Sequence, residues 1–464
     1  MSEKLEKALG NRWIQFSLLV VISLIAFALR FYKLGEWSFW YDESYTMRDV
    51  RNLQQLGYLD QQVSRTLIYL IVNALGVTEF NARLAPALIG VITIPILFFP
   101  IRQMLGVGVA LLASLFLALN PWHLYWSQNA RFYTALLLFY TLALLVFYLG
   151  IEKDKPWYMV LFLLLLGLAV QERLFAVFLV PIVAAYLLIL RFLPFEKPAG
   201  LRWRNVLILV IPSLVLGLLY SLEFFRDPGK WLNGFGWVNN NPFWILSGVV
   251  FYVGLSIVCM GAAAAIFMLL HKNRAVLLLT LAAVFPLAAL MALSLVQYTA
   301  NRYAFVSLTS WLILAALGVW LLLSQSKGLG WVLAVGVSLI LILEPLSETY
   351  LYYHDQNGNR DNWKAAFKLI NSLKEPGDQV MVTNIELGDL YMEEPTQRIF
   401  RFDTTNPPTD GGRIWFIEDN NLGEKLPDKL KWVQDNTELI ANFDVRVRAR
   451  NFKMRVYLFD PEKQ

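Results

Sequence analysis

The sequence predicts a polytopic all-α membrane domain of about eleven transmembrane helices followed by a small soluble α/β domain. Of its 464 residues, 57% are hydrophobic and 16% are charged, whereas soluble proteins average about 25% charged residues. Long apolar stretches recur up to residue 346 and are missing from the sequence after it. We therefore expect a transmembrane domain at residues 1–346 and a soluble domain at residues 347–464.

Apolar runs near the ~20 residues needed to cross a bilayer define the expected spans. Short runs can be accommodated by tilt or by local thinning of the bilayer. The spans are expected at residues 14–32, 84–101, 106–121, 132–150, 157–171, 174–192, 205–222, 243–270, 275–297, 303–323 and 329–346.

The distribution of Lys and Arg between short loops predicts the orientation, because cytoplasmic loops carry the excess. With the N-terminus in the cytoplasm, the richer loops are cytoplasmic; they contain Arg102, Lys153, Lys155, Arg191, Lys197, Arg202, Arg204, Lys272, Arg274 and Lys327. The opposite short loops hold fewer basic residues. An odd number of spans then places residues 347–464 outside and makes residues 33–83 a long outside loop.

Four polar clusters coincide with the outside ends of the expected spans. Charged groups at membrane depth are costly and usually functional, so this convergence predicts a site on the outside face. The clusters are Asp42-Glu43, Gln128-Asn129-Ala130-Arg131, Gln171-Glu172-Arg173 and Asn301-Arg302-Tyr303.

Asp42 and Glu43 follow three aromatic residues, Phe39 to Tyr41, in the outside loop. Apolar spacing at 45–56 and 66–75 predicts helices lying in the interface plane. Neighbouring residues on a helix point about 100° apart, so the two carboxylates suit different roles. A dry aromatic environment raises a carboxyl pKa and makes the group a usable base. The alternative is that both residues only stabilise a helix start through the macrodipole.

The order of these motifs resembles a known family. Tyr41-Asp42-Glu43 opens the outside loop, and a later span ends at Asn120-Pro121 and precedes the segment Tyr125 to Tyr133. Arg302-Tyr303 opens another span. Together they resemble the protein O-mannosyltransferase and aminoarabinose-transferase group of C-type (GT-C) glycosyltransferases. Residues 367–382 resemble the start of the soluble domain that often follows, so the resemblance covers nearly the whole chain.

The resemblance implies a GT-C membrane fold and the transfer of a sugar from a polyprenyl-phosphate or polyprenyl-diphosphate donor to an extracytoplasmic acceptor. It implies that Asp42 is the general base and that Glu43 is an acceptor-side or structural partner. The aminoarabinose-transferase pattern often has an Arg soon after the Asp-Glu pair, whereas Ser44 and Tyr45 stand here. The acceptor expected is a protein, a lipid or a polysaccharide.

Arg131, Arg173 and Arg302 are the candidates for holding the donor phosphate, since guanidinium groups pair well with phosphate oxygens. The alternative for each is a snorkelling residue at a helix end, and Glu172 beside Arg173 favours a local ion pair. Gln128, one helical turn before Arg131, is expected to share its face. The expected substrate and lipid pocket comprises Tyr41, Tyr45, Gln128, Tyr133 and Tyr303.

The sequence gives no metal-binding pattern. His123, His271 and His354 lack zinc spacing, and Cys259 is the single cysteine. We therefore expect that no metal or other cofactor is required. Nucleic acid is not an expected partner, because Lys and Arg are scattered between the spans.

The soluble domain is expected to contain helices at 363–373 and 427–433, strands at 379–383 and 413–417, and a strand pair formed by 439–447 and 452–459. It has no phosphate-binding loop and no nucleophile motif. An acceptor-facing or stabilising role is therefore expected.

Two alternatives to a transferase stay open, and a third, a pseudoenzyme or scaffold, is disfavoured by the intact Asp42-Glu43 pair. A transporter or flippase for lipid-linked sugars would place polar groups near the bilayer midplane, whereas the clusters here are peripheral. A polysaccharide ligase or polymerase would also act outside on lipid-linked sugars. We expect the prokaryotic plasma membrane as the location, because the chain is compact.

Overall fold

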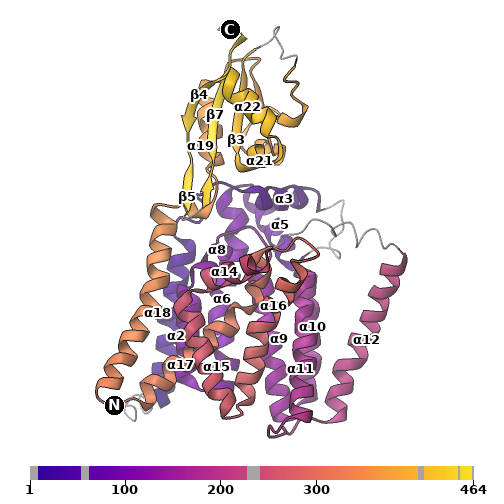
Figure 1. The fold of residues 1–464 in the computed structure, drawn as a ribbon, viewed down its shortest axis with the longest axis vertical. Coiled ribbons are helices and arrows are strands. Elements are labelled where there is room, and N and C mark those ends of the chain that lie inside the picture. Colours follow the sequence, from indigo (N-terminus) through magenta and orange to yellow (C-terminus); the bar gives the residue numbers. More distant parts are fainter. Residues whose placement is uncertain (1–8, 54–61, 227–240, 406–411, 448–449, 462–464) are drawn as a thin grey trace.

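In the computed structural model, residues 9–53, 62–226, 241–405, 412–447 and 450–461 are described. Long helices run side by side, and a small sheet-containing region stands over one end of them, called the upper end here (Figure 1). The expected fold class, a helical membrane protein with a small C-terminal α/β region, is therefore confirmed. Residues 227–240, which make up most of the loop at residues 223–241, lie outside the described residues.

Seven helices within the described ranges are long and apolar enough to cross a membrane by themselves. Two of them begin with a 3-10 turn, η1 (Leu174–Phe178) and η2 (Asn301–Ser307). The seven are α2 (Arg12–Phe31), α6 (Glu79–Leu105), α9 (Tyr133–Lys153), η1 with α11 (Leu179–Phe192), α16 (Arg274–Leu293), η2 with α17 (Leu308–Gln325) and α18 (Leu329–His354).

Two of the expected spans correspond to bent helix pairs. The helix pair α7 (Val107–Leu119) and α8 (Pro121–Ser127) bends by 59°, and α14 (Pro242–Val253) and α15 (Leu255–Leu270) bend by 98°. Asn120 accepts hydrogen bonds from the first backbone N–H groups of α8, and Pro121 begins that helix, so the chain restarts there. Gly254 breaks the second pair with φ +103°, a conformation that favours glycine.

The two remaining expected spans correspond to shorter apolar helices, α10 (Pro156–Glu172) and the Trp203–Val215 part of α12 (Trp203–Arg226). Seven full spans, two bent pairs and these two helices together account for the eleven expected segments. Length and composition by themselves support seven to nine crossings in the described part of the chain.

Two helices cross the upper end instead of spanning it: α3 (Tyr41–Arg51) and α5 (Val63–Leu75). They lie below the C-terminal sheet, where interfacial helices were predicted (Figure 1). The helix α3 begins at Tyr41, four residues before the predicted start, so Asp42 and Glu43 occupy its first turn. Their charges stabilise that turn through the helix dipole.

The C-terminal region combines a five-stranded sheet with helices. Its strand order is β2-β1-β3-β7-β4, parallel from β2 to β3 and antiparallel from β3 to β4, and a separate hairpin pairs β5 with β6. The strands are β1 (Gln379–Val382), β2 (Gln397–Arg398), β3 (Ile414–Asp419), β4 (Glu438–Asn442), β5 (Val445–Val447), β6 (Arg450–Phe452) and β7 (Met454–Phe459). The helices are η3 (Asn357–Asn359), α19 (Trp363–Leu373), α20 (Ile385–Tyr391), η4 (Ile399–Arg401), α21 (Asn420–Lys425) and α22 (Pro427–Asn436).

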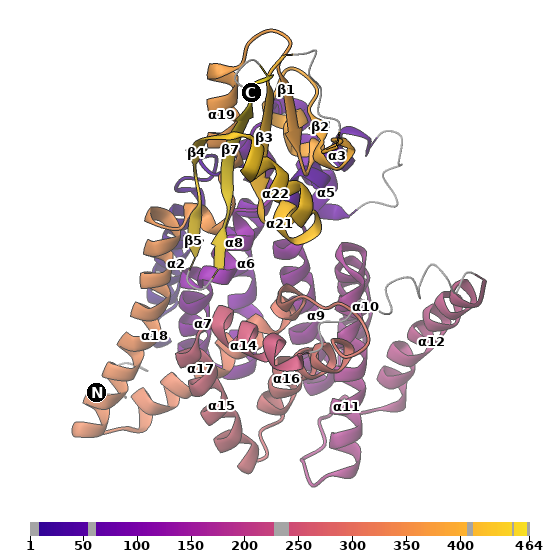
Figure 2. The ribbon, with the colours of Figure 1, turned by 45° about the horizontal axis from the view of Figure 1, so that its top comes forward.

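One apolar cluster joins the C-terminal region to the helices beneath it. Met47 of α3 and Ile68 of α5 pack in the same cluster as Trp363 and Phe367 of α19, and α20 packs against α3. Figure 2 shows α3 and α5 beside the C-terminal strands. The predicted boundary at residue 346 falls inside α18, which runs on to His354. The first turn of α3 is therefore held between the C-terminal region and the upper ends of the membrane helices.

Candidate active site

The first turn of α3 directs its two carboxylates into different surroundings. Glu43 is fully buried, and its oxygens accept hydrogen bonds from Arg83 Nε at 2.8 Å, from Arg83 Nη2 at 2.7 Å and from the Ala130 backbone N–H at 2.7 Å. Arg360 Nη1 lies 3.4 Å from the same carboxylate. Glu43 thus joins α3 to α6, to the turn after α8 and to the segment after α18.

Charge pairing keeps this buried carboxylate ionised. Burial by itself would raise the pKa of Glu43, but the charges of Arg83 and Arg360 and the hydrogen bonds from Arg83 and Ala130 lower it below the usual value. A buried ion pair with filled hydrogen-bonding positions fixes geometry, and breaking it is costly. The contacts of Glu43 fit the structural-partner role that was expected of it.

Asp42 is partly open, with 22% of its side chain exposed, and it faces two guanidinium groups. Its Oδ2 lies 3.6 Å from Arg131 Nη2 and 3.9 Å from Arg302 Nη2. Both distances exceed a direct hydrogen bond, so the carboxylate keeps capacity to accept a proton from another group. Arg131 is fixed separately, since its Nη1 donates to the Asp42 backbone oxygen and to Thr46 Oγ1, each at 2.9 Å.

Further arginines lie on the same side of α3 as Asp42. The guanidinium carbons of Arg131 and Arg173 are 5.2 Å and 5.5 Å from the centre of the Phe132 ring, and Arg65, which pairs with Asp49 at 3.3 Å, lies within electrostatic range of both. The three predicted phosphate-binding arginines are therefore brought to one region. Such a cluster can stabilise the charge of a phosphate group.

The expected ion pair between Glu172 and Arg173 is not formed in the described part of the chain. Glu172 instead accepts hydrogen bonds from the Ser64 backbone N–H at 2.9 Å and from Ser64 Oγ at 2.6 Å. These bonds attach the start of α5 to the end of α10. Arg173 is exposed beside Phe132.

The expectation that Gln128 and Arg131 share a helix face was wrong. The helix α8 ends at Ser127, and the chain turns through residues 128–132 before α9, so i,i+3 spacing no longer aligns the side chains. Gln128 is buried and donates to the backbone oxygens of Arg30 and Tyr32 at 3.0 Å and 2.8 Å. It therefore contacts α2, whereas Arg131 contacts α3.

Two of the predicted pocket tyrosines lie near the arginines. Tyr133 is buried and stacks on Trp126 with ring centroids 3.7 Å apart, and Tyr303 packs against Phe175 at 5.3 Å. Arg302 lies within electrostatic range of both tyrosines. They form the aromatic side of the region around Asp42.

The other two tyrosines face the C-terminal region. Tyr41 hydrogen-bonds to Thr383, which donates to Asp419 at 2.9 Å, and burial, reinforced by the charge of Asp419, raises the pKa of Tyr41 well above its usual value. Tyr45 is 37% exposed, with Arg48 over its ring. Tyr41 is thus a docking residue between α3 and the sheet.

Three arginines around the two carboxylates were not predicted from the sequence. Arg83 and Arg360 hold Glu43, and Arg65 extends the cationic group beside Asp42. Arg83 stands directly before an expected apolar span, so its position at a membrane boundary was a usable signal. Arg360 carries no such signal, because it follows a polar turn after α18. Among the described residues, no group of three or more His, Cys, Asp or Glu is arranged to hold a metal ion.

Comparisons with known proteins agree with this architecture. Residues 63–217 match the family described as dolichyl-phosphate-mannose-protein mannosyltransferase. The chain resembles the ArnT structure from Cupriavidus metallidurans bound to undecaprenyl phosphate, with TM-score 0.61, 14% identity, and coverage of 95% of this chain and 97% of that one. It also resembles AglB from Archaeoglobus fulgidus, an archaeal oligosaccharyltransferase in complex with an inhibitory peptide and a dolichol-phosphate, with TM-score 0.58, 13% identity, and coverage of 96% and 74%.

A curated relative is the dolichyl-phosphooligosaccharide-protein glycotransferase 2 of Pyrococcus furiosus, 32% identical over 143 residues. That match covers 30% of this chain and spans 19% of the relative's length. Together the findings show that the chain shares the membrane fold of these solved structures. The family match covers about a third of the chain and agrees with the resemblance to the protein mannosyltransferases.

Proposed function

We propose that the protein transfers a sugar from a polyprenyl-phosphate carrier to a hydroxyl-bearing acceptor at the upper end of its membrane helices, with Asp42 as the general base. The observation that carries the proposal is the setting of Asp42. Its carboxylate is partly open and faces Arg131 and Arg302 at 3.6 Å and 3.9 Å, while the adjacent Glu43 holds the helix in place.

In the proposed reaction, the acceptor oxygen forms a bond to the anomeric carbon of the sugar, and the bond from that carbon to the carrier phosphate oxygen breaks. Asp42 takes the acceptor proton. The departing phosphate gains negative charge, which Arg131 and Arg302 stabilise, with Arg173 at the edge. Fixed guanidinium groups act most strongly where charge develops in the transition state.

The proposal places the upper end on the extracytoplasmic side of a prokaryotic plasma membrane, with the N-terminus in the cytoplasm. The Lys and Arg distribution supports this orientation. Residues 1–346 would form the catalytic domain and residues 347–464 an acceptor-facing or stabilising domain. The ArnT and AglB structures, which hold undecaprenyl phosphate and dolichol-phosphate, support a polyprenyl-phosphate donor.

The test uses the full chain in sealed proteoliposomes, with radiolabelled polyprenyl-phosphate sugars and an envelope extract as acceptor. Released polyprenyl phosphate and labelled product are measured for the native chain, for Asp42→Asn and for Asp435→Asn, an exposed control on α22. We expect native turnover, about a hundredfold loss in Asp42→Asn and no change in the control. Equal turnover in Asp42→Asn would remove Asp42 from the mechanism, whereas lipid movement across the bilayer without product would indicate a transporter.

A further inference from the structure

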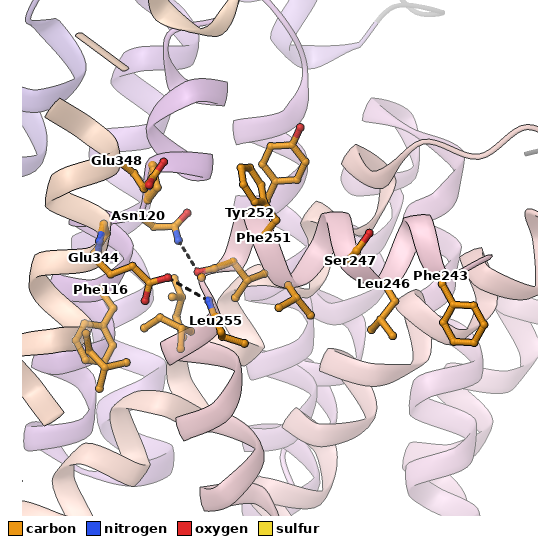
Figure 3. Close-up of a pocket in the computed structure, with 18 residues that line it drawn as sticks. Phe116, Asn120, Phe243, Leu246, Ser247, Phe251, Tyr252, Leu255, Glu344 and Glu348 are labelled. Carbon is orange, nitrogen blue, oxygen red and sulfur yellow. Dashed lines mark hydrogen bonds between the residues drawn. The ribbon is translucent and has the colours of Figure 1, made fainter. Parts of the chain in front are cut away.

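A cavity of about 540 Å³ lies apart from the Asp42 region, between α14, α15 and α18 (Figure 3). Its volume is in the range of small-molecule pockets. Phe116 of α7 and Leu312 of α17 complete its wall, and most of its lining is apolar. Phe243 and Leu255 at the cavity are 69% and 60% exposed, so the cavity reaches the side of the helix bundle that lipid would cover.

The helix α14 separates this cavity from the arginines around Asp42. Leu246, Ser247 and Val250, spaced along one face of α14, line the cavity. On another face, Gly248 packs so closely against Asn301 that an added Cβ would lie 1.7 Å from the Asn301 amide nitrogen. Asn301 directly precedes Arg302, so that face of α14 adjoins the Asp42 region.

An aromatic contact continues the separation at the C-terminal end of α14. The ring of Tyr252 stacks on Trp122, with centroids 5.2 Å apart and planes at 20°, and Trp122 in turn packs against Phe305. The Asn120 side chain also donates to the Val253 backbone oxygen at 3.4 Å. The direct route from Arg302 to the cavity is therefore filled by packed side chains.

The charges on the cavity wall are negative. Glu344 and Glu348, one turn apart on α18, line it, and no Lys, Arg or His is among its described lining residues. Glu344 accepts a hydrogen bond from the backbone N–H of Leu255 at 3.2 Å (Figure 3). It also accepts from the backbone N–H of Ser256 at 3.3 Å and from the Ser256 hydroxyl. The carboxylate therefore fills the anion-binding position at the start of α15.

We propose that this cavity is a second lipid site, distinct from that of the donor carrier, which takes the apolar chain of a membrane lipid whose head group has no net negative charge. Apolar contact with Phe243, Leu246 and Val250 would hold the chain. Glu344 and Glu348 disfavour a phosphate or other anionic head group nearby. This proposal does not depend on the transferase activity, because binding alone defines it.

The test is photo-crosslinking to the full chain in detergent micelles that contain either of two probes with a diazirine on the acyl chain. One probe is zwitterionic phosphatidylcholine and the other is anionic phosphatidylglycerol. Peptides of α14, α15 and α18 are then quantified by mass spectrometry. We expect the zwitterionic probe to label them about tenfold more than the anionic probe. Equal labelling by the two probes would overturn the charge selectivity.

A competition experiment distinguishes the proposed site from the donor site and needs no variant. A molar excess of undecaprenyl phosphate is added to the native chain with the zwitterionic probe. Unchanged labelling is expected, because the donor carrier would bind on the other side of α14. Displacement of the probe would overturn the proposal by assigning the cavity to the carrier.

Variants then locate the labelling. Ser247→Trp and the smaller change Val250→Phe each fill the cavity and are expected to reduce labelling severalfold. Leu343→Trp, at an exposed position on α18 that does not line the cavity, is the matched control. Labelling that persists in folded Val250→Phe, or that falls equally in Leu343→Trp, would contradict a site at this cavity.

Discussion

The two sides of the first turn of α3 differ in almost every physical respect, although Asp42 and Glu43 are neighbours in the chain. Glu43 is fully buried with its oxygens filled by Arg83 and the Ala130 backbone. Asp42 is partly exposed, and the nearest cationic atoms stand 3.6 Å and 3.9 Å away. One carboxylate has its partners in place, and the other has room for a reacting group.

The comparison shows how a single helical turn can serve both structure and chemistry. Because adjacent residues point about 100° apart, the fixed position of Glu43 determines the direction of Asp42. Glu43 contacts α6, the turn before α9 and the segment after α18, so several parts of the fold converge on that direction. The variants below separate the contributions of the two sides, starting from the largest expected effect.

Removing the charge of Glu43 is expected to have the largest effect. Glu43→Gln leaves Arg83 and Arg360 buried without their carboxylate, and breaking a buried ion pair costs about 3–5 kcal/mol. Thermal unfolding in detergent should show a clearly lower midpoint, and activity should fall with it. The matched control is Asp42→Asn, which should keep the native midpoint while losing activity. Equal midpoints for Glu43→Gln and the native chain would refute the assigned structural role.

Arg131→Gln tests the opposite side of the turn. It removes the guanidinium nearest to Asp42 Oδ2 together with two hydrogen bonds to α3. By comparison with other groups that stabilise developing charge, kcat/KM should fall by about a hundredfold. Arg51→Gln, an exposed change later in α3, is the control and should leave kcat/KM unchanged. A loss in both variants would point to a general effect on α3 and against phosphate stabilisation.

Arg302 should matter less than Arg131. Its one described contact with Asp42 is longer, at 3.9 Å, and 34% of its side chain is exposed. We expect Arg302→Gln to lower kcat/KM by about tenfold, and Arg302→Lys to recover part of the loss because the charge is kept. Steady-state kinetics with varied donor concentration would check the ranking. A greater loss in Arg302→Gln than in Arg131→Gln would reverse it.

The fold was predictable from the sequence because membrane helices and interfacial helices follow from apolar length and pattern. The helix at 363–373 and the strands at 379–383 and 413–417 were also found close to their expected positions. The bend at Gly254 was not anticipated, because it lies inside the apolar run at 243–270. The bend at Asn120 coincides with the end of the span expected at 106–121, but the short helix α8 after it was not predicted. Hydropathy reports the length of such a run and carries no information on its bending.

The site was predictable only in part, for a related reason. Charged residues at span ends identified Asp42, Glu43 and three arginines, and the structure brings them to one end of the helices. The partners Arg83 and Arg360 lie 40 and 317 residues from Glu43 in the sequence, so their contacts depend on tertiary packing. Gln128 was misjudged because helical spacing was extended through a turn.

A last expected effect concerns pH and the C-terminal region beside α3. Burial, followed by the nearby charge of Asp419, raises the pKa of Asp361 to about 7. A carboxyl group whose pKa is raised on folding holds its proton more tightly in the folded state, so its contribution favours folding at low pH and is lost as the pH rises through 7. The contribution of Glu43 to folding stability depends on pH in the opposite direction. Its pKa is lowered in the folded state, so that contribution is lost as the pH falls.

The contribution of Asp361 can be isolated by unfolding midpoints measured between pH 5 and 8. Glu43 is mainly ionised in both states over this range and adds little slope, whereas ionisation of Asp361 should lower the native midpoint as the pH rises toward 7. Asp361→Asn should flatten that slope and make the chain more stable than native at pH 8. Asp435→Asn, exposed on α22, is the control and should keep the native slope. A slope unchanged by Asp361→Asn would show that this carboxyl does not titrate with the folding of the region beside α3.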